Sequence, residues 1–185
     1  MSARAGESVS LECVSEGANP APRLSWRLRG TPLQPAHQQH NERSAAGLWR
    51  SVSRLSLPVS REDHGYEVTC EVEHPATPAA INGSVRLNIF YPPRVTAHSS
   101  VAGPLTEGSA AAVTLTCEVE SNPPGVVSWR RVGGQVVGSG PSLTLQPVRR
   151  ELAGGYQCQA ENELGLSQPA TVQLDVQCKS GLHHL

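Results

Sequence analysis

One pattern occurs twice in this chain of 185 residues, and it strongly limits what the chain can fold into. In each copy a cysteine lies on a segment of alternating apolar and polar residues, a tryptophan follows, and a second cysteine closes the pattern. The first copy has Cys13, Trp26 and Cys70, and the second has Cys117, Trp129 and Cys158. This order is typical of two antiparallel sheets packed face to face, with the tryptophan against a disulfide that joins the sheets. The sequence therefore predicts an all-β chain made of two such sandwiches.

The composition supports short strands joined by turns. The chain has 17 glycines and 15 prolines but only one phenylalanine and one methionine, which favours frequent turns over helices. The formal net charge is −1 without a basic stripe or an acidic tail, so we expect no nucleic-acid partner. No apolar run approaches the roughly 20 residues that cross a bilayer. We expect any membrane attachment to come from a segment outside this sequence.

Alternation predicts further strands around the two tryptophans. Residues 29–50 show little periodicity and are interpreted as edge strands and loops. Pro58 faces outward in a short alternating run and favours an edge strand there, because proline cannot donate to a neighbouring strand. The residues expected to face the first core are Val9, Leu11, Leu24, Leu28, Leu55, Leu57, Val59, Tyr66, Val68, Val72, Val85, Leu87 and Ile89, the last three on one final strand.

The sequence Tyr91-Pro92-Pro93 separates the two copies. Two prolines fix two φ angles and remove two donors, so we expect a short, semi-rigid linker. The predicted domains are residues 1–91 and 92–178, followed by a tail at 179–185.

The cysteines indicate an oxidising compartment. The pairs Cys13–Cys70 and Cys117–Cys158 are expected to be structural disulfides, which persist outside the cytosol. The N-terminus, Met-Ser-Ala-Arg-Ala-Gly-Glu, has no apolar core of the kind that a signal peptide needs. We therefore expect a fragment of an extracellular or cell-surface protein whose upstream signal lies outside this sequence.

Short motifs around the cysteines carry a family resemblance. They are CVSEGANP at 13–20, REDHG at 61–65, CEVEHP at 70–75 and GYQCQAENELG at 155–165. These motifs resemble those of immunoglobulin-superfamily cell-adhesion ectodomains, in particular the nectin-like synaptic adhesion molecules and the nephrin group. The resemblance implies two tandem immunoglobulin-like β-sandwiches, the first C2-type and truncated at its N-terminus, the second I-set or C2-type, joined by the proline-containing linker.

The resemblance also implies roles for single residues. Tyr156 lies two residues before Cys158, the position of the tyrosine corner, whereas Val68 holds that position in the first half, so we expect no corner there. Leu152 stands where the family has an acidic residue, so we expect the turn-bracing ion pair to be absent. The expected core residues are Trp26, Trp129 and Tyr156.

Two residues are candidates for covalent modification. Asn82-Gly83-Ser84 is an acceptor sequence for N-glycosylation; the alternative is that Asn82 and Gly83 only turn the chain into the last strand. Cys178 is left without an expected partner. Two interpretations are open: Cys178 forms a disulfide with another molecule or with a segment outside this sequence, or it is a free thiol in a frayed tail.

The sequence predicts no metal centre, no cofactor and no enzymatic activity. His37 and His40 in a loop and His183-His184 in the tail lack the three or four convergent ligands that zinc needs. No nucleophile lies in a recognisable catalytic motif, and Gly133-Gly134 is expected to be a hairpin turn rather than a phosphate loop. Leu174-Asp175-Val176 resembles an integrin-recognition tripeptide, but alternation directs Leu174 and Val176 into the core.

Trp49 is compatible with two interpretations. Its parity with Leu55 and Leu57 favours a core position on an edge strand, whereas an exposed tryptophan is typical of a binding hot spot. The candidate surfaces for a partner are the loop from His37 to Arg50 and the face of Glu71, Glu73 and His74.

We therefore expect an ectodomain fragment of a cell-surface immunoglobulin-superfamily adhesion or recognition receptor. The expected partner is a protein, another immunoglobulin-superfamily ectodomain, bound like-to-like or heterophilically. Two alternatives stay open: a secreted, soluble immunoglobulin-type decoy or matrix protein, and the ectodomain of a growth-factor-type receptor.

Overall fold

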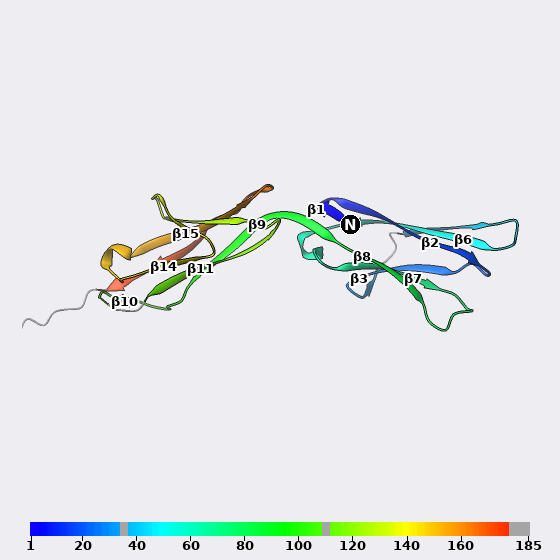
Figure 1. Cartoon of the computed structure of the whole chain (residues 1–185), viewed down its shortest axis with the longest axis horizontal. Helices are drawn as coiled ribbons and strands as arrows, with labels where there is room; N and C mark the ends of the chain where they lie inside the picture. Colours follow the sequence, from blue (N-terminus) through cyan, green and yellow to red (C-terminus); the bar gives the residue numbers. More distant parts are fainter. Residues whose placement is uncertain (34–36, 109–111, 178–185) are drawn as a thin grey trace, which may run out of the picture. The chain divides into compact units, whose positions relative to one another are not determined.

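The structure of this chain, a computed structural model, consists almost entirely of β-strands (Figure 1). It describes residues 1–33, 37–108 and 112–177. In these ranges the only helical elements are two 3₁₀ turns, η1 (Arg61–Asp63) and η2 (Arg150–Leu152), and no helix there is long and apolar enough to cross a membrane. The strands are β1 (Ser2–Arg4), β2 (Ser8–Ala18), β3 (Arg23–Leu28), β4 (Thr31–Pro32), β5 (His37–Arg43), β6 (Trp49–Pro58), β7 (Glu67–Glu73), β8 (Ile81–Arg86), β9 (Asn88–Ser99), β10 (Leu105–Thr106), β11 (Val113–Asn122), β12 (Val126–Arg131), β13 (Val136–Ser139), β14 (Ser142–Leu145), β15 (Gly154–Asn162), β16 (Gly165–Leu166), β17 (Ala170–Leu174) and β18 (Val176–Gln177).

The chain divides into two units, Met1–Phe90 and Tyr91–Leu185. In unit 1, one sheet has the strand order β2-β6-β5 and the other has the order β4-β3-β7-β8, and all pairs in them are antiparallel. β1 adds a parallel pair with the start of β9. The two sheets pack through their apolar faces, as in a β-sandwich.

Unit 2 repeats this arrangement. One sheet contains β9, β11 and β14 in that order, and the other is built around β12 and β15, with β13 beside β12 and with β16 and β17 beside β15. β10 pairs in parallel with β18, as β1 does with β9. The predicted all-β fold of two tandem sandwiches is confirmed.

Alternation explains the two cores. In each unit the tryptophan lies directly across a strand pair from the second cysteine, and the apolar members of the alternating runs surround it. The buried apolar residues of unit 1 are Val9, Leu24, Trp26, Val52, Leu55, Leu57, Val59, Val68, Cys70, Leu87 and Ile89, and those of unit 2 are Leu105, Val113, Leu115, Cys117, Val127, Trp129, Val148, Tyr156, Cys158, Ala160, Val172 and Leu174.

The prediction of an edge strand at Leu55 and Leu57 is wrong. β6 lies between β2 and β5 and is the central strand of its sheet. Pro58 is tolerated there because β5 begins opposite Leu55, so no described residue of β5 faces Pro58. The segment from His37 to Arg43, interpreted partly as loop, is the strand β5.

Two other details of the predicted layout are wrong. Tyr66 shares the parity of Cys70 but is exposed, because β7 begins only at Glu67. The final strand of unit 1 is not continuous: it is interrupted at Leu87, between β8 and β9. Leu87 is nevertheless fully buried, as the sequence predicts.

The two sandwiches differ at one edge. In unit 2, β9 pairs with β11, and Leu115 and Cys117 are buried. In unit 1 no described strand pairs with the corresponding edge of β2, and Leu11 and Cys13 are only half-buried. A hollow of about 340 Å³ opens there between β2 and β8, with Trp26 among its lining residues. The disulfide of unit 1 therefore lies nearer to solvent than that of unit 2.

Candidate contact surface

Disulfides form the covalent frame of both units. Cys13 is bonded to Cys70, and Cys117 is bonded to Cys158. Each bond joins a strand of one sheet to a strand of the other. The turns at the ends of the strands are thereby held on a rigid support.

The indole N–H of each core tryptophan has an acceptor. Trp26 Nε1 donates to Ser53 Oγ at 2.9 Å, and Trp129 Nε1 donates to the carbonyl oxygen of Gly140 at 3.1 Å. Ser53 is fully buried on the inward-facing parity of β6, where the pattern would favour an apolar side chain. Because a buried donor without a partner is costly, these acceptors stabilise the observed orientation of each ring.

Tyr156 forms the tyrosine corner that the sequence suggests. Its hydroxyl donates to the carbonyl oxygen of Leu152 at 3.1 Å. Burial raises the pKa of Tyr156 above its ordinary value of 10.0, and the positive charge of Arg131 opposes that rise. The Arg131 guanidinium carbon lies 5.2 Å from the centre of the Tyr156 ring.

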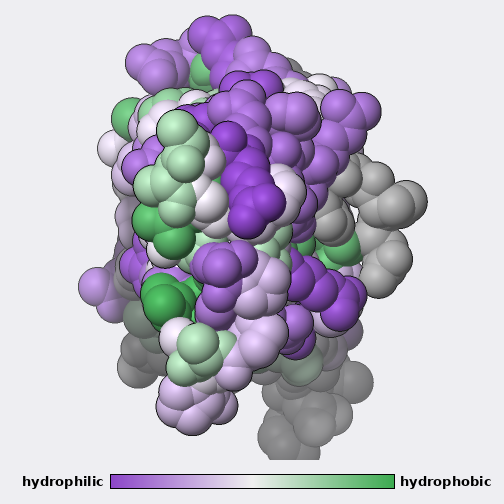
Figure 2. All heavy atoms as spheres, turned by 90° about the vertical axis from the view of Figure 1, so that its right-hand side faces the viewer, coloured by the Kyte–Doolittle hydropathy of each residue, from purple (hydrophilic) through white to green (hydrophobic). Residues whose placement is uncertain are grey.

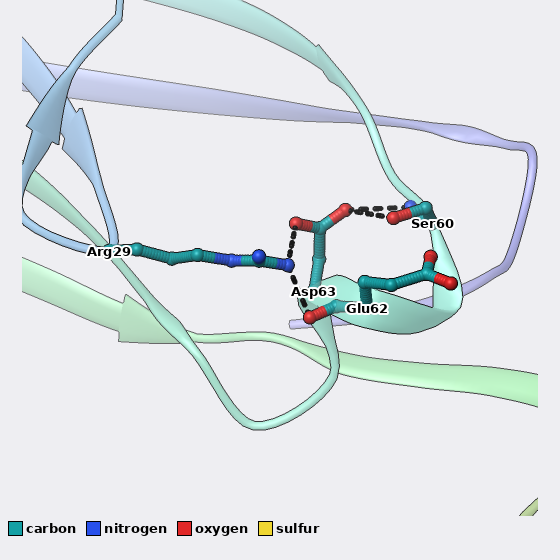
Figure 3. A network of polar contacts seen from close by, with 4 residues as sticks. All are labelled: Arg29, Ser60, Glu62 and Asp63. Carbon is teal, nitrogen blue, oxygen red and sulfur yellow. Dashed lines mark hydrogen bonds and ion pairs between the residues drawn. The ribbon is translucent and has the colours of Figure 1, made fainter.

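A buried carboxylate braces one turn of unit 1 (Figure 3). Asp63 Oδ2 accepts hydrogen bonds from the amide and the hydroxyl of Ser60 at 2.8 and 2.7 Å, and Asp63 Oδ1 lies 2.8 Å from Arg29 Nη2. Arg29 also donates to the carbonyl of Glu62. Its guanidinium carbon lies 4.3 Å from the ring centre of Tyr66, which explains how that exposed ring is held. Sequence reasoning missed this network, although the spacing from Ser60 to Asp63 matches that of a capping box.

Unit 2 has an arginine at the corresponding turn but no carboxylate in the position of Asp63. Arg131 donates to the carbonyl oxygens of Glu151 and Ala153 at 2.6 and 2.5 Å. Leu152 is the third residue of η2, as Asp63 is of η1. Backbone carbonyls therefore take the place of the carboxylate at this turn.

One outer face of unit 1, on sheet β4-β3-β7-β8, carries charges that oppose one another. Arg27 and Glu71 form an ion pair of 2.7 Å. Glu73 lies opposite Arg23 in the register of β3 and β7. Because these charges have opposite neighbours on the face itself, the face offers little unbalanced charge to a partner.

His74 does not belong to this face, contrary to the predicted surface of Glu71, Glu73 and His74. Its Nε2 lies 3.0 Å from the carbonyl oxygen of Pro20, and its Nδ1 accepts a hydrogen bond from the amide of Ala76 at 3.1 Å. With Nδ1 an acceptor, the ring proton is on Nε2 and is donated to Pro20. His74 therefore ties two turns together.

Three turns lie at one end of unit 1: residues 19–22, 44–48 and 74–80. They lie at the same end because Ala18 pairs with Trp49, and β3 begins where β7 ends. Figure 2 looks at this end and shows small hydrophobic areas separated by hydrophilic residues rather than one continuous apolar patch.

Trp49 begins β6 at this end and is half-buried, intermediate between the two predicted alternatives. The guanidinium carbon of Arg43, its partner across β5 and β6, lies 5.8 Å from a Trp49 ring centre. The turn between them is closed: the Ser44 amide donates to the Leu48 carbonyl at 2.8 Å, and Arg43 Nε donates to the Gly47 carbonyl at 3.3 Å. Leu48 is 41% exposed. These five residues are called the Trp49 corner below.

Asn82 lies inside strand β8, so the alternative interpretation of Asn82-Gly83 as a turn is wrong. All three residues of the acceptor sequence are exposed. In the integrin-like tripeptide Leu174 is buried and Val176 packs against the core of unit 2, while Asp175 is exposed between them.

The remaining predicted site residues lie in a strand, in a turn or outside the described part of the chain. His37 and His40 belong to β5, and Gly133-Gly134 lies in the turn between β12 and β13. In the described ranges no group of three or more histidine, cysteine, aspartate or glutamate side chains could hold a metal ion. Cys178, His183 and His184 lie outside the described residues.

Two family models match the chain. Residues 1–80 match the model for the CD80-like C2-set immunoglobulin domain, and residues 92–162 match the model for the immunoglobulin domain. The chain belongs to the immunoglobulin superfamily.

Individual relatives agree with the resemblance seen in the sequence. Cell adhesion molecule 1 of Homo sapiens is 31% identical over 169 residues, which are 86% of this chain and 37% of the relative. Nephrin of Rattus norvegicus is 31% identical over 183 residues, 94% of this chain and 14% of nephrin. The crystal structure of the full ectodomain of mouse nectin-like molecule 4 matches with a TM-score of 0.82 and 26% identity, covering 100% of this chain and 64% of that one. The predicted likeness to the nectin-like and nephrin groups is confirmed, and the chain spans little more than a third, or less, of these curated relatives.

Proposed function

We propose that this chain is part of the extracellular portion of a cell-surface adhesion or recognition receptor and acts by contact with another protein. The likeness to Cell adhesion molecule 1 over most of the chain is the observation that carries the proposal. The two disulfides support an oxidising, extracellular location. The partner is another immunoglobulin-superfamily ectodomain, either a second copy of this protein or a different member.

The Trp49 corner is the surface of unit 1 best suited to such contact. Tryptophan and arginine are enriched among the residues that dominate binding energy, and here Arg43 lies next to Trp49 with Leu48 exposed beside them. The hydrogen bonds that close the turn at Ser44 and Gly47 fix its shape before binding. A preformed turn loses less conformational entropy when a partner docks.

The experiment compares two exposed arginines. The chain is displayed on beads, and binding is measured to beads that carry the same chain and to a panel of immunoglobulin-superfamily ectodomains. Arg43→Ala changes the Trp49 corner, and the matched control Arg86→Ala removes one arginine from β8 on the other sheet.

Arg43→Ala is expected to weaken binding about tenfold or more, the size of effect seen at hot spots, while Arg86→Ala leaves binding nearly unchanged. Failure of the folded, disulfide-bonded protein to bind any member of the panel or itself would contradict the adhesion role. Equal losses in both variants would show that contact is not centred on the Trp49 corner.

A further inference from the structure

Strand β8 presents its acceptor sequence openly. Asn82, Gly83 and Ser84 are all exposed, and an added Cβ at Gly83 would meet no atom within 4 Å. β8 pairs with β7 on one side, and no described strand pairs with its other side. The Asn82 amide is therefore reachable from solvent on an edge strand.

The register fixes the face on which Asn82 lies. Asn82 is opposite Glu71, Ser84 is opposite Thr69, and Arg86 is opposite Glu67 across β7 and β8. Side chains directly opposite each other on a sheet have Cβ atoms about 5 Å apart. A group attached to Asn82 would therefore begin beside the Arg27–Glu71 ion pair, on the outer face of sheet β4-β3-β7-β8.

We propose that Asn82 carries an N-linked oligosaccharide that covers this outer face and leaves the Trp49 corner, on the other sheet, as the open surface for protein contact. The proposal rests on the proposed extracellular location, because the sugar is transferred in the secretory pathway.

The chemistry needs one co-reactant, an oligosaccharide linked to a lipid pyrophosphate. The Asn82 Nδ2 forms a bond to the anomeric carbon of the first sugar, and the bond between that carbon and the pyrophosphate oxygen breaks. The lipid pyrophosphate leaves with the bonding electron pair, and the amide nitrogen loses one proton to a base of the transferase. The Ser84 hydroxyl completes the acceptor sequence, and no oxidation or reduction occurs.

The surface under the sugar suits a hydrated, bulky group. The face is lined by charged and hydroxyl side chains, among them the Arg27–Glu71 pair, Thr69 and Ser84. Glycans are bulky and solubilising, so a glycan on Asn82 would keep large partners away from this face. Because the face is polar, the glycan would not have to cover apolar side chains. It would also stand at the free edge of β8, where an exposed strand can otherwise pair with another molecule.

Glycan occupancy at Asn82 is tested by expressing the chain in mammalian cells with an added signal peptide. The signal peptide directs the chain into the secretory pathway, so the test does not depend on the location of the native protein. Treatment with peptide-N-glycosidase F is expected to lower the intact mass of the wild-type chain by the mass of a glycan. The shift is lost in Asn82→Gln and in Ser84→Ala but retained in Ser84→Thr, which keeps the acceptor sequence. A secreted wild-type chain with no mass shift overturns the proposal without bearing on adhesion.

Shielding is tested by labelling carboxylates in Ser84→Thr and Ser84→Ala, which differ at one residue and in the glycan. Labelling of Glu71 and Glu73 is expected to rise about twofold or more in Ser84→Ala, since the bulky surface sugar no longer excludes the reagent. Glu12 and Glu16, on the outer face of the other sheet, serve as internal controls and should not change. Equal labelling of Glu71 and Glu73 in the two variants overturns the shielding and leaves the adhesion proposal untouched.

Discussion

Trp26 and Ser53 are joined by a buried hydrogen bond of 2.9 Å that crosses from one sheet of unit 1 to the other. Ser53 belongs to β6 in the sheet of Cys13, whereas Trp26 belongs to β3 in the sheet of Cys70. The hydroxyl thus supplies the polar partner that a tryptophan needs when its ring is buried.

Ser53→Ala should destabilise unit 1 by about 1–3 kcal/mol, because the Trp26 N–H is left buried without an acceptor. The measurement is guanidinium unfolding followed by tryptophan fluorescence. Ser56→Ala, at an exposed position of the same strand, is the control and should stay within about 0.5 kcal/mol of the wild type. A similar small change for Ser53→Ala would mean that the indole has another acceptor.

Asp63→Ala should also destabilise unit 1, by about 1–3 kcal/mol, because Ser60 and Arg29 lose a charged acceptor. Thermal unfolding monitored by circular dichroism gives the comparison. The exposed carboxylate of Glu73 provides the control, and Glu73→Ala should have little effect. If the two variants unfold alike, the network of Figure 3 contributes nothing measurable.

Reduction should open Cys13–Cys70 before Cys117–Cys158. Cys13 is half-buried beside the hollow between β2 and β8, whereas Cys117 is buried on β11, whose edge is paired with β9. Access of the attacking thiol limits exchange. Brief treatment with a thiol, alkylation and peptide mapping should show the unit 1 cysteines labelled first. The opposite order would mean that the open edge of β2 does not control access.

Unit 2 should lose stability in strongly alkaline solution through Tyr156. Because burial raises the pKa of Tyr156 in the folded state, its contribution is fully present below pH 10 and is lost as the pH rises toward the raised pKa. Denaturation of unit 2 at a series of pH values should show this decline. Tyr156→Phe removes the titrating group, so its stability should depend less on pH above 10; an unchanged dependence would assign the decline to other groups.

The sequence was sufficient for the features that depend on local alternation. The buried residues flanking Cys70 and Cys158, Val68 and Tyr156, follow from period-two patterns that any half-buried strand shares. The disulfide pairing required only the spacing of the Cys-Trp-Cys pattern. The buried positions follow from the pattern of neighbouring residues, and the pairing follows from a covalent constraint.

Features that depend on contacts between distant residues could not be predicted in the same way. Tyr66 has the parity of Cys70, yet it lies outside the core under Arg29, which is 37 positions earlier in the sequence. β6 is the central strand of its sheet because β5 pairs with it. The sequence of β5 has no alternation of apolar and polar residues that would predict this pairing. The Trp49 corner joins residues only six positions apart, but it depends on the hairpin of β5 and β6, which the weak periodicity of residues 29–50 does not predict.

The pairing of strand β9 determines where the chain should be divided if the two units are to be expressed separately. Its residues 88–90 pair with β1, while the pairing of β11 extends back to Tyr91, and the Tyr91 carbonyl accepts a hydrogen bond from Asn162 at 3.1 Å. A recombinant second half that starts at Pro92 would lack this anchor. An excision point directly after Phe90 keeps the β1–β9 pairs in the first piece, and it keeps the pairing of Tyr91 and its hydrogen bond from Asn162 in the second.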